Sequence, residues 1–201
     1  MTASSPYDLP LDLGARLDAI GAPLPDPKPL RFAAVLAPLL PALDAREGPR
    51  LLLIERAQNL RKHAGQLAFP GGKPEPDDDD LLDTALREAE EEVGLNRERV
   101  AILGRLAPVP TPSGYMIIPY VARVLDDWAP GPVDQGEVAA TLTPSLRLLS
   151  DPSRYIFRGS ADWRGQYYEL HEFTIHVPPL WGATARIVFD LLRRLEIEPR
   201  P

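Results

Sequence analysis

The chain of 201 residues contains no cysteine. This absence excludes disulfide bonds, thiolate metal sites and a cysteine nucleophile, and it fits a reducing compartment. We therefore expect a cytoplasmic protein. The length is sufficient for one domain with a sizeable core.

An excess of positive charge and long apolar runs are also missing. The formal net charge is −7, which argues against a nucleic-acid partner because such proteins need a basic face. The apolar runs at 33–40 and 51–54 have the length of strands and fall far short of a membrane span. Residues 1–20 lack the basic start and apolar core of a secretory signal. We therefore expect no membrane partner.

The most informative segment that is present lies at residues 71–95. Gly71 and Gly72 allow a tight turn. The acidic stretch behind them predicts a helix over about 80–93, with aspartates at its positive N-terminus. Gly94 lies where a left-handed cap would end this helix.

Three glutamates of the predicted helix share one face. At 100° per residue, Glu88, Glu91 and Glu92 fall within an arc of roughly 100°, and Arg87 is spaced to pair with Glu91. A solvated charge run is the alternative interpretation. Because like charges repel, their clustering favours a hard divalent cation, Mg²⁺ or Mn²⁺, which prefers oxygen ligands.

Residues 87–95, read as R-E-A-E-E-E-V-G-L, resemble the second half of the Nudix box, G-x5-E-x7-R-E-U-x-E-E-x-G-U, where U is a bulky aliphatic residue. The first half departs from that pattern. Counted from Gly72, the acidic position is Asp78 instead of a glutamate, and one extra residue separates it from Arg87.

A second match lies just upstream, at residues 52–72. It is similar to the signature L-L-T-x-R-S/A-x3-R-x3-G-x3-F-P-G-G of the coenzyme A pyrophosphatase branch of the Nudix family, with Ile54 in place of threonine. Members of that branch also tend to carry the one-residue insertion. The resemblance covers roughly residues 30–196.

The resemblance implies a fold class and a domain division. We expect an α/β protein: a Nudix-type α/β/α sandwich with a mixed β-sheet and a loop–helix–loop catalytic motif. Residues 1–29 are expected to form an N-terminal helix and a proline-rich linker, and residues 30–197 the Nudix hydrolase domain.

The pattern of the remaining residues predicts alternating strands and helices. Strands are expected at 31–40, 50–56, 100–106, 116–125, 154–163 and 167–177, with a structured loop at 58–73. Helices are expected at 8–20, at 143–149 with Thr143 as the N-cap, and at 181–195 as an amphipathic closing helix.

The same resemblance implies the residues of the site. Glu88, Glu91 and Glu92 would hold the metal, with the Gly72 carbonyl as a further ligand. Glu88, Glu91 and Glu137 are the candidate catalytic acids, and the sequence leaves the identity of the base open. For Glu137, an exposed loop glutamate is the alternative.

Candidate substrate-binding residues come from the two flanking segments. Arg56, Arg61 and Gly65 belong to the upstream signature, and Arg61 suits a phosphate because a guanidinium binds it in a bidentate manner. Ser113 and Tyr115 are expected to line the pocket, although a tight turn into the next strand explains them equally well.

The resulting hypothesis is a Mg²⁺- or Mn²⁺-dependent hydrolase with a small nucleotide substrate. It would cleave the diphosphate of coenzyme A or acyl-CoA to 3′,5′-ADP and (acyl-)4′-phosphopantetheine. Two alternatives remain: a Nudix pyrophosphatase for NADH, ADP-ribose or a dinucleotide polyphosphate, and a non-catalytic nucleotide-binding domain. The sequence leaves a homodimer open.

Overall fold

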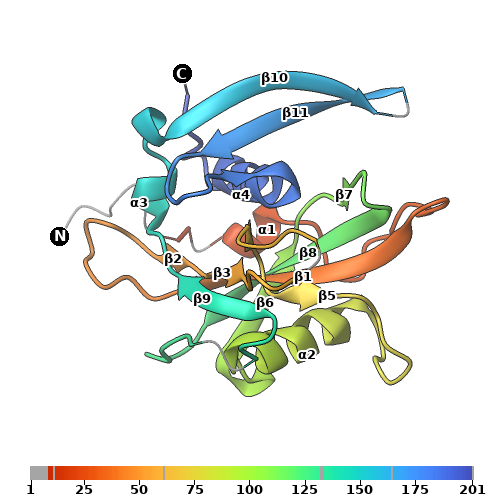
Figure 1. Ribbon diagram of the computed structural model, residues 1–201. Helices are drawn as coiled ribbons and strands as arrows, with labels where there is room; N and C mark the ends of the chain where they lie inside the picture. The colour runs from red at the N-terminus through yellow and green to blue at the C-terminus, as the bar shows by residue number, and fades with distance from the viewer. Residues whose placement is uncertain (1–8, 11, 61, 132–133, 164, 201) are drawn as a thin grey trace.

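The computed structural model describes residues 9–10, 12–60, 62–131, 134–163 and 165–200. Helices lie on both sides of a central mixed sheet, so the expected α/β/α sandwich is confirmed (Figure 1). Helix α2 (Leu81–Val93) lies on one side and α4 (Gly182–Arg194) on the other.

The central sheet is built around two long parallel strands. Strand β1 (Arg31–Leu40) pairs in parallel with β8 (Tyr115–Val124), with Arg31 opposite Tyr115. Antiparallel strands complete this sheet: β2 (Arg50–Leu51), β5 (Gly71–Gly72), β6 (Val100–Arg105) and β7 (Val109–Pro110).

Strand β1 is buried on both faces. Ala34 and Leu36 belong to the core that contains α2, whereas Ala37 and Leu39 belong to the core that contains α4. Alternation along a strand sends successive side chains to opposite faces. A sheet covered on both faces accounts for the nearly continuous apolar run in this part of the sequence.

Helix α2 begins and ends where the sequence predicts. Asp80 is the N-cap, and its Oδ1 accepts a hydrogen bond from Asp83 N at 2.8 Å. Gly94 adopts a left-handed conformation with φ 72°, which a residue with a side chain adopts only at a cost. These two ends fix the axial position of the glutamates.

The other side of the sheet is covered by the C-terminal third of the chain. Strands β10 (Tyr155–Trp163) and β11 (Gln166–Phe173) form a hairpin that arches over α4 (Figure 1). Strand β12 (Leu180–Trp181) pairs with β11 and leads directly into α4.

A small antiparallel sheet lies beside the central one. It contains β4 (Leu67–Ala68), β3 (Leu53–Arg56) and β9 (Val138–Leu142) in that order. The pairing of β3 with β9 brings Arg56 opposite Val138. Glu137, which directly precedes β9, therefore lies beside the end of β3, where its main-chain oxygen accepts a hydrogen bond from Ala57 N. Two 3₁₀ turns, Arg97–Arg99 and Pro152–Arg154, precede β6 and β10.

The strand expected at 50–56 is divided into β2 and β3, which belong to different sheets. Three further predicted elements differ from the structure. In the 8–20 segment only α1 (Leu13–Arg16) is helical, because Leu17 is extended and Asp18 pairs with Arg105 in a β-bridge; Asp8 and Leu11 lie outside the described residues. The strand expected to reach residue 177 ends at Phe173.

The last difference concerns the helix expected at 143–149. Helix α3 (Leu146–Leu149) is capped by Ser145, whose Oγ accepts from Leu148 N, and not by Thr143. The Thr143 hydroxyl accepts a hydrogen bond from Arg50 instead.

The N-terminal segment packs on the same core as the rest of the chain. Leu13 and Leu17 are buried in the cluster that contains α4. The main-chain oxygens of Ala22 and Pro23 accept hydrogen bonds from Arg105. A domain boundary at residue 29 stays a prediction. No helix in the described part of the chain is long and apolar enough to cross a membrane.

Candidate active site

Glu92 is the most deeply buried carboxylate of α2. The residue is 2% exposed; its Oε2 accepts a hydrogen bond from Gly71 N at 3.1 Å, while Oε1 is buried with no partner among the described residues. Burial raises the pKa of Glu92 to about 8, and the charges of Glu88 and Glu137 act in the same direction. A buried acceptor without a partner costs free energy, so this arrangement points to a ligand at Oε1.

Glu88 lies against the backbone of Gly72. A Cβ atom built on Gly72 would collide with the Glu88 carboxylate, so this position accepts only glycine unless Glu88 moves. Burial also raises the pKa of Glu88, and Arg87 opposes that shift. The structure thus brings together Gly72, Glu88 and Glu92, three of the four predicted metal ligands.

Glu91 lies further out on the same helix. Its side chain is 57% exposed, and Oε2 accepts a hydrogen bond from Arg87 Nη1 at 3.0 Å, which confirms the expected i,i+4 pair. Arg87 Nη1 also lies 3.2 Å from Glu88 Oε1. Within the described ranges, no three acidic or imidazole side chains are gathered closely enough to hold one ion. The three-glutamate metal set therefore stays a prediction.

Asp78 has a structural partner that the sequence analysis missed. Its Oδ1 accepts from Arg87 Nε at 2.8 Å and its Oδ2 from Arg87 Nη2 at 3.2 Å, and Thr84 and Glu75 N also donate to Oδ2. Hydrogen bonds from Arg87 hold the pKa of Asp78 well below its usual value. This bidentate pair orients the guanidinium that holds Glu88 and Glu91. The place of Asp78 at the acidic position of the box is the signal that could have revealed it.

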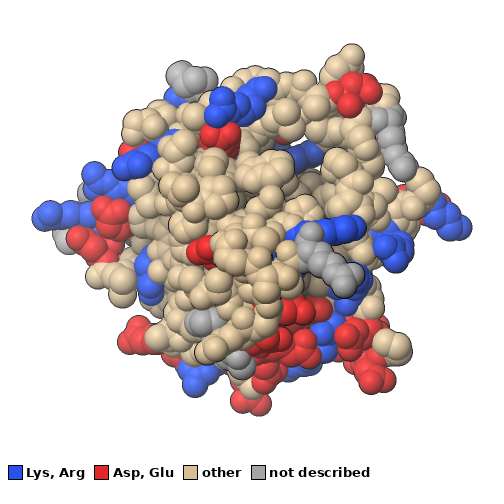
Figure 2. All heavy atoms as spheres, viewed as in Figure 1, with Lys and Arg blue, Asp and Glu red and all other residues tan. Residues whose placement is uncertain are grey.

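Glu137 and Arg56 face α2 from the small sheet. The Glu137 main-chain oxygen accepts from Ala57 N at 2.8 Å, and the Glu137 carboxylate is close enough to raise the pKa of both Glu88 and Glu92. Arg56 has the opposite effect on Glu92. Three predicted site acids and one predicted cation therefore share a single region. Acidic side chains gather over this part of the surface (Figure 2).

The loop between β3 and β4 closes back on Arg56. Gly65 N donates to Arg56 O, and Arg56 N donates to Gln66 O. Gly65 has φ +67°, and a Cβ there would lie 2.5 Å from Gln58 Nε2, so the turn favours glycine. Gly65 is thus explained by the turn itself. Arg61, the predicted phosphate-binding residue of this loop, lies outside the described residues.

Ser113 and Tyr115 lie beside the N-terminal end of β1, where Tyr115 pairs with Arg31. The Ser113 and Thr111 hydroxyls are 2.9 Å apart inside a tight turn, which matches the turn interpretation. Arg31 donates to the Tyr115 hydroxyl at 3.0 Å and also stacks over its ring. Tyr115 pairs with Arg31 and Gly72 with Ala34. The two positions are therefore separated by about 10 Å along β1.

The oxygen donors around Glu92 fit a hard divalent cation. The free Oε1 atom is buried, the neighbouring donors are carboxylate or backbone oxygens, and the charged form of Glu92 is disfavoured without a counter-charge. Glu88 and Glu92 would hold such an ion, with Gly72 O and Glu91 as further donors. The choice between Mg²⁺ and Mn²⁺ stays open, since both accept these ligands.

A family model described as the NUDIX domain matches residues 34–153. Two relatives carry the name "Uncharacterized Nudix hydrolase NudL", one from Yersinia pestis (strain Pestoides F) and one from Yersinia pseudotuberculosis serotype O:1b (strain IP 31758). Each is 42% identical over 171 residues, which cover 83% of this chain and 81% of the relative.

A solved structure of a MutT/nudix family protein from Enterococcus faecalis aligns with a TM-score of 0.57 at 18% identity, covering 87% of this chain and 65% of that one. At that identity the likeness shows the fold alone. Because the family model spans more than half of the chain and the relatives are similar along most of its length, this protein belongs to the Nudix family, as a hydrolase of a nucleoside diphosphate derivative.

Proposed function

We propose that this Nudix hydrolase cleaves the diphosphate of coenzyme A or acyl-CoA, releasing 3′,5′-ADP and (acyl-)4′-phosphopantetheine. The proposal rests on the signature at residues 52–72, which is similar to that of the coenzyme A pyrophosphatase branch. Nudix hydrolases in general use divalent cations such as Mg²⁺ or Mn²⁺.

The observation that carries the proposal is the way this signature surrounds the acids of α2. Its first part contributes Arg56, whose charge acts on Glu92, and Ala57, whose main-chain N donates to Glu137 O. Its end contributes Gly71 N, which donates to Glu92, and Gly72, which lies against Glu88. The residues that resemble the branch signature are therefore the ones that shape the site.

The side chains divide the chemistry between them. Glu88 and Glu92 would hold a divalent cation, which would supply charge neutralisation at the diphosphate and activate a water. Arg56 would bind a phosphate oxygen with charge-assisted hydrogen bonds. Glu91 and Glu137 are both exposed and can accept the proton of the attacking water.

A substrate panel with identification of the products by mass tests the proposal. Coenzyme A and acetyl-CoA should be cleaved in preference to NADH, ADP-ribose and a dinucleotide polyphosphate, and should yield 3′,5′-ADP. Preferred cleavage of one of the other compounds would replace the substrate while retaining the enzyme class. No turnover of any of them with Mg²⁺ or Mn²⁺ would favour the non-catalytic nucleotide-binding domain.

Arg61 is the candidate for recognition of the 3′-phosphate of coenzyme A. If it has that role, dephospho-coenzyme A should be the poorer substrate by about ten- to a hundredfold, the value of one charge-assisted contact. Arg61→Ala should remove most of this preference, and the neighbouring Lys62→Ala serves as the control. An equal loss of kcat/KM for both substrates in Arg61→Ala would contradict the role.

A further inference from the structure

A cavity lies between the proline-rich stretch at 23–30 and the hairpin β10–β11. Its volume is about 580 Å³, within the range typical of small-molecule sites. Among the residues that the structure describes, the lining includes none of the α2 carboxylates. The cavity is therefore separate from the acid site.

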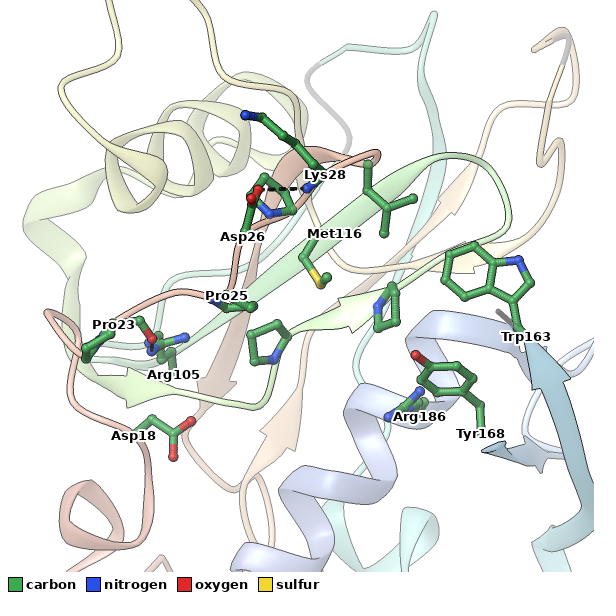
Figure 3. Close-up of a pocket in the computed structure, with 14 residues that line it drawn as sticks. Asp18, Pro23, Pro25, Asp26, Lys28, Arg105, Met116, Trp163, Tyr168 and Arg186 are labelled. Carbon is green, nitrogen blue, oxygen red and sulfur yellow. Dashed lines mark hydrogen bonds between the residues drawn. The ribbon is translucent and has the colours of Figure 1, made fainter. Parts of the chain in front are cut away.

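The hairpin supplies two aromatic rings to this cavity. Trp163 and Tyr168 are 6.1 Å apart between ring centroids and tilted by 59°, and both line the pocket (Figure 3). Met116 and Leu30 line it as well, together with several prolines. A flat, weakly polar ring can bind against such surfaces by stacking and by removal of apolar area from water.

The cavity is also cationic in an otherwise acidic chain. Lys28, Arg105 and Arg186 line it, against Asp18 and Asp26. Asp18 is paired with Arg194 at 3.2 Å, and Asp26 accepts from the main-chain N of Lys28 at 3.0 Å. The carboxylates of Asp18 and Asp26 thus have partners other than Arg105 and Arg186.

Neither Arg186 nor Arg105 forms an ion pair with a carboxylate among the described residues. Arg186 stacks over Tyr168 at 4.6 Å, and the charges of Asp190 and Glu169 act on it from beyond ion-pair distance. Burial lowers its pKa, which shows that the cation is partly removed from water. Arg105 is 3% exposed, and its Nη1 is buried without a hydrogen-bond partner among the described residues. An anionic ligand would offset both costs.

We propose that this cavity binds a nucleoside phosphate, with the base against Trp163 and Tyr168 and a phosphate at Arg186. The ring surfaces account for a planar group and the cations for an anionic one, which together describe a nucleotide better than a free phosphate or an apolar ligand. Two sources are consistent with this chemistry: the nucleotide end of the enzyme's own substrate, and a separate nucleotide. The position of the cavity favours the substrate's own nucleotide. The lining residues Leu30 and Met116 are the sequence neighbours of Arg31 and Tyr115, and Tyr115 is a predicted substrate-binding residue.

Calorimetric titration with ADP, in the presence of a chelator, tests binding without turnover. The full-length protein should bind ADP, and Arg186→Ala should weaken binding by about tenfold or more, the effect of losing one charge-assisted phosphate contact. Arg193→Ala is the matched control, since Arg193 lies on the same helix, is exposed and pairs with Asp190; it should bind ADP as the wild type does. Circular dichroism and the melting temperature verify the fold of each variant.

The base contact is tested separately. Pyrophosphate should bind more weakly than ADP, and Tyr168→Leu should reduce the affinity for ADP more than that for pyrophosphate. Equal affinities for ADP and pyrophosphate in the wild type would overturn the base contact. The absence of ADP binding would overturn the site. A loss of ADP affinity in Arg56→Ala but not in Arg186→Ala would also overturn it, because ADP would then bind at the α2 acids.

Inhibition by ADP distinguishes the two sources. With Mg²⁺ and the best substrate of the panel, competitive inhibition that is relieved in Arg186→Ala identifies the cavity as the place of the substrate's own nucleotide. Non-competitive inhibition or activation that is lost in Arg186→Ala identifies a separate nucleotide. Because the titration needs no turnover, failure of the proposed substrate would leave the binding result interpretable.

Discussion

Helices α2 and α4 have equal length and cover opposite sides of one sheet, yet they bury different chemistry. Helix α4 buries only apolar side chains: Ala185, Ile187, Val188, Leu191 and Leu192. Helix α2 buries Ala85, Ala89 and Val93 together with Thr84 and Glu92. Helix α4 therefore contributes mainly to stability, whereas α2 has a carboxylate on part of its packing face.

This difference has an energetic meaning. Complete burial of a leucine side chain favours folding by about 1.5–3 kcal/mol, whereas burial of an unpaired carboxylate opposes folding. The sheet and α4 must therefore supply the stability that α2 does not. Changes on the two helices should separate stability from catalysis, and the following predictions use that separation.

Removal of divalent cations should have the largest effect on activity. A chelator should abolish hydrolysis, because the diphosphate then lacks charge neutralisation. The apolar core should keep the protein folded, unlike a small domain whose fold depends on its metal. Thermal unfolding followed by circular dichroism should stay cooperative, with a melting temperature modestly below that with Mg²⁺. Loss of the cooperative transition would make the site structural.

Leu191→Ala should have the largest effect on stability. This side chain is fully buried in the α4 core, and its truncation should cost about 2–5 kcal/mol. Urea unfolding measures the loss, with Leu43→Ala as the control because Leu43 is 83% exposed. The kcat of the folded fraction should change little. A comparable loss of kcat at a permissive temperature would contradict the separation of the two helices.

Asp78→Asn should lower both stability and activity by intermediate amounts. Loss of the bidentate pair leaves Arg87 partly buried without its main partner, at a cost of about 2–4 kcal/mol. The pKa of Asp78 is lowered in the folded state, so the pair stabilises fully above the unfolded value of about 4 and less as pH falls below it. The difference from wild type should therefore shrink on acidification.

Urea midpoints between about pH 3 and pH 7 measure this dependence. Asp79→Asn is the matched control, since Asp79 is exposed and adjacent in sequence. A difference that grows on acidification would contradict the assignment of Asp78 as an ionised partner of Arg87.

Tyr115→Phe should have the smallest effect. The ring that stacks with Arg31 remains, and only the hydroxyl is lost. If that hydroxyl and Arg31 contact the substrate, KM should rise by about fivefold or less at constant kcat, the value of one ordinary hydrogen bond. Tyr167→Phe on the exposed hairpin is the control. An unchanged KM would contradict a substrate contact of the Tyr115 hydroxyl and leave Tyr115 only a structural role in the turn.

The elements with strong local signals could be predicted from the sequence. Asp80, Gly94 and the helical spacing of the glutamates determine α2 through capping and periodicity, and α4 follows from its apolar stripe. Capping and periodicity do not reveal the partner of Asp78, because residues 77–80 are four aspartates with the same chemistry. The position of Asp78 in the Nudix box is the one local signal that distinguishes it.

Long-range pairing accounts for the remaining differences. Residues near Asp18 form a bridge to Arg105 instead of extending a helix, and Arg50 takes the Thr143 hydroxyl that would otherwise cap α3. The arch of β10–β11 over α4, and with it the cavity lined by Trp163 and Tyr168, depends on contacts between segments far apart in sequence. Local propensity carries no information about such contacts.

The most direct test of the central claim is to compare Glu92→Gln with Glu90→Gln. Glutamine keeps the size of Glu92 and removes a charge that burial disfavours, so the melting temperature should stay near that of the wild type. Turnover with saturating Mg²⁺ should fall by at least about a hundredfold, because a carboxylate that holds the cation contributes several kcal/mol to the transition state. Glu90 is exposed and binds Asn96, so its variant should retain near-normal kcat/KM. Near-normal turnover in Glu92→Gln would contradict the assignment of α2 as the catalytic metal face.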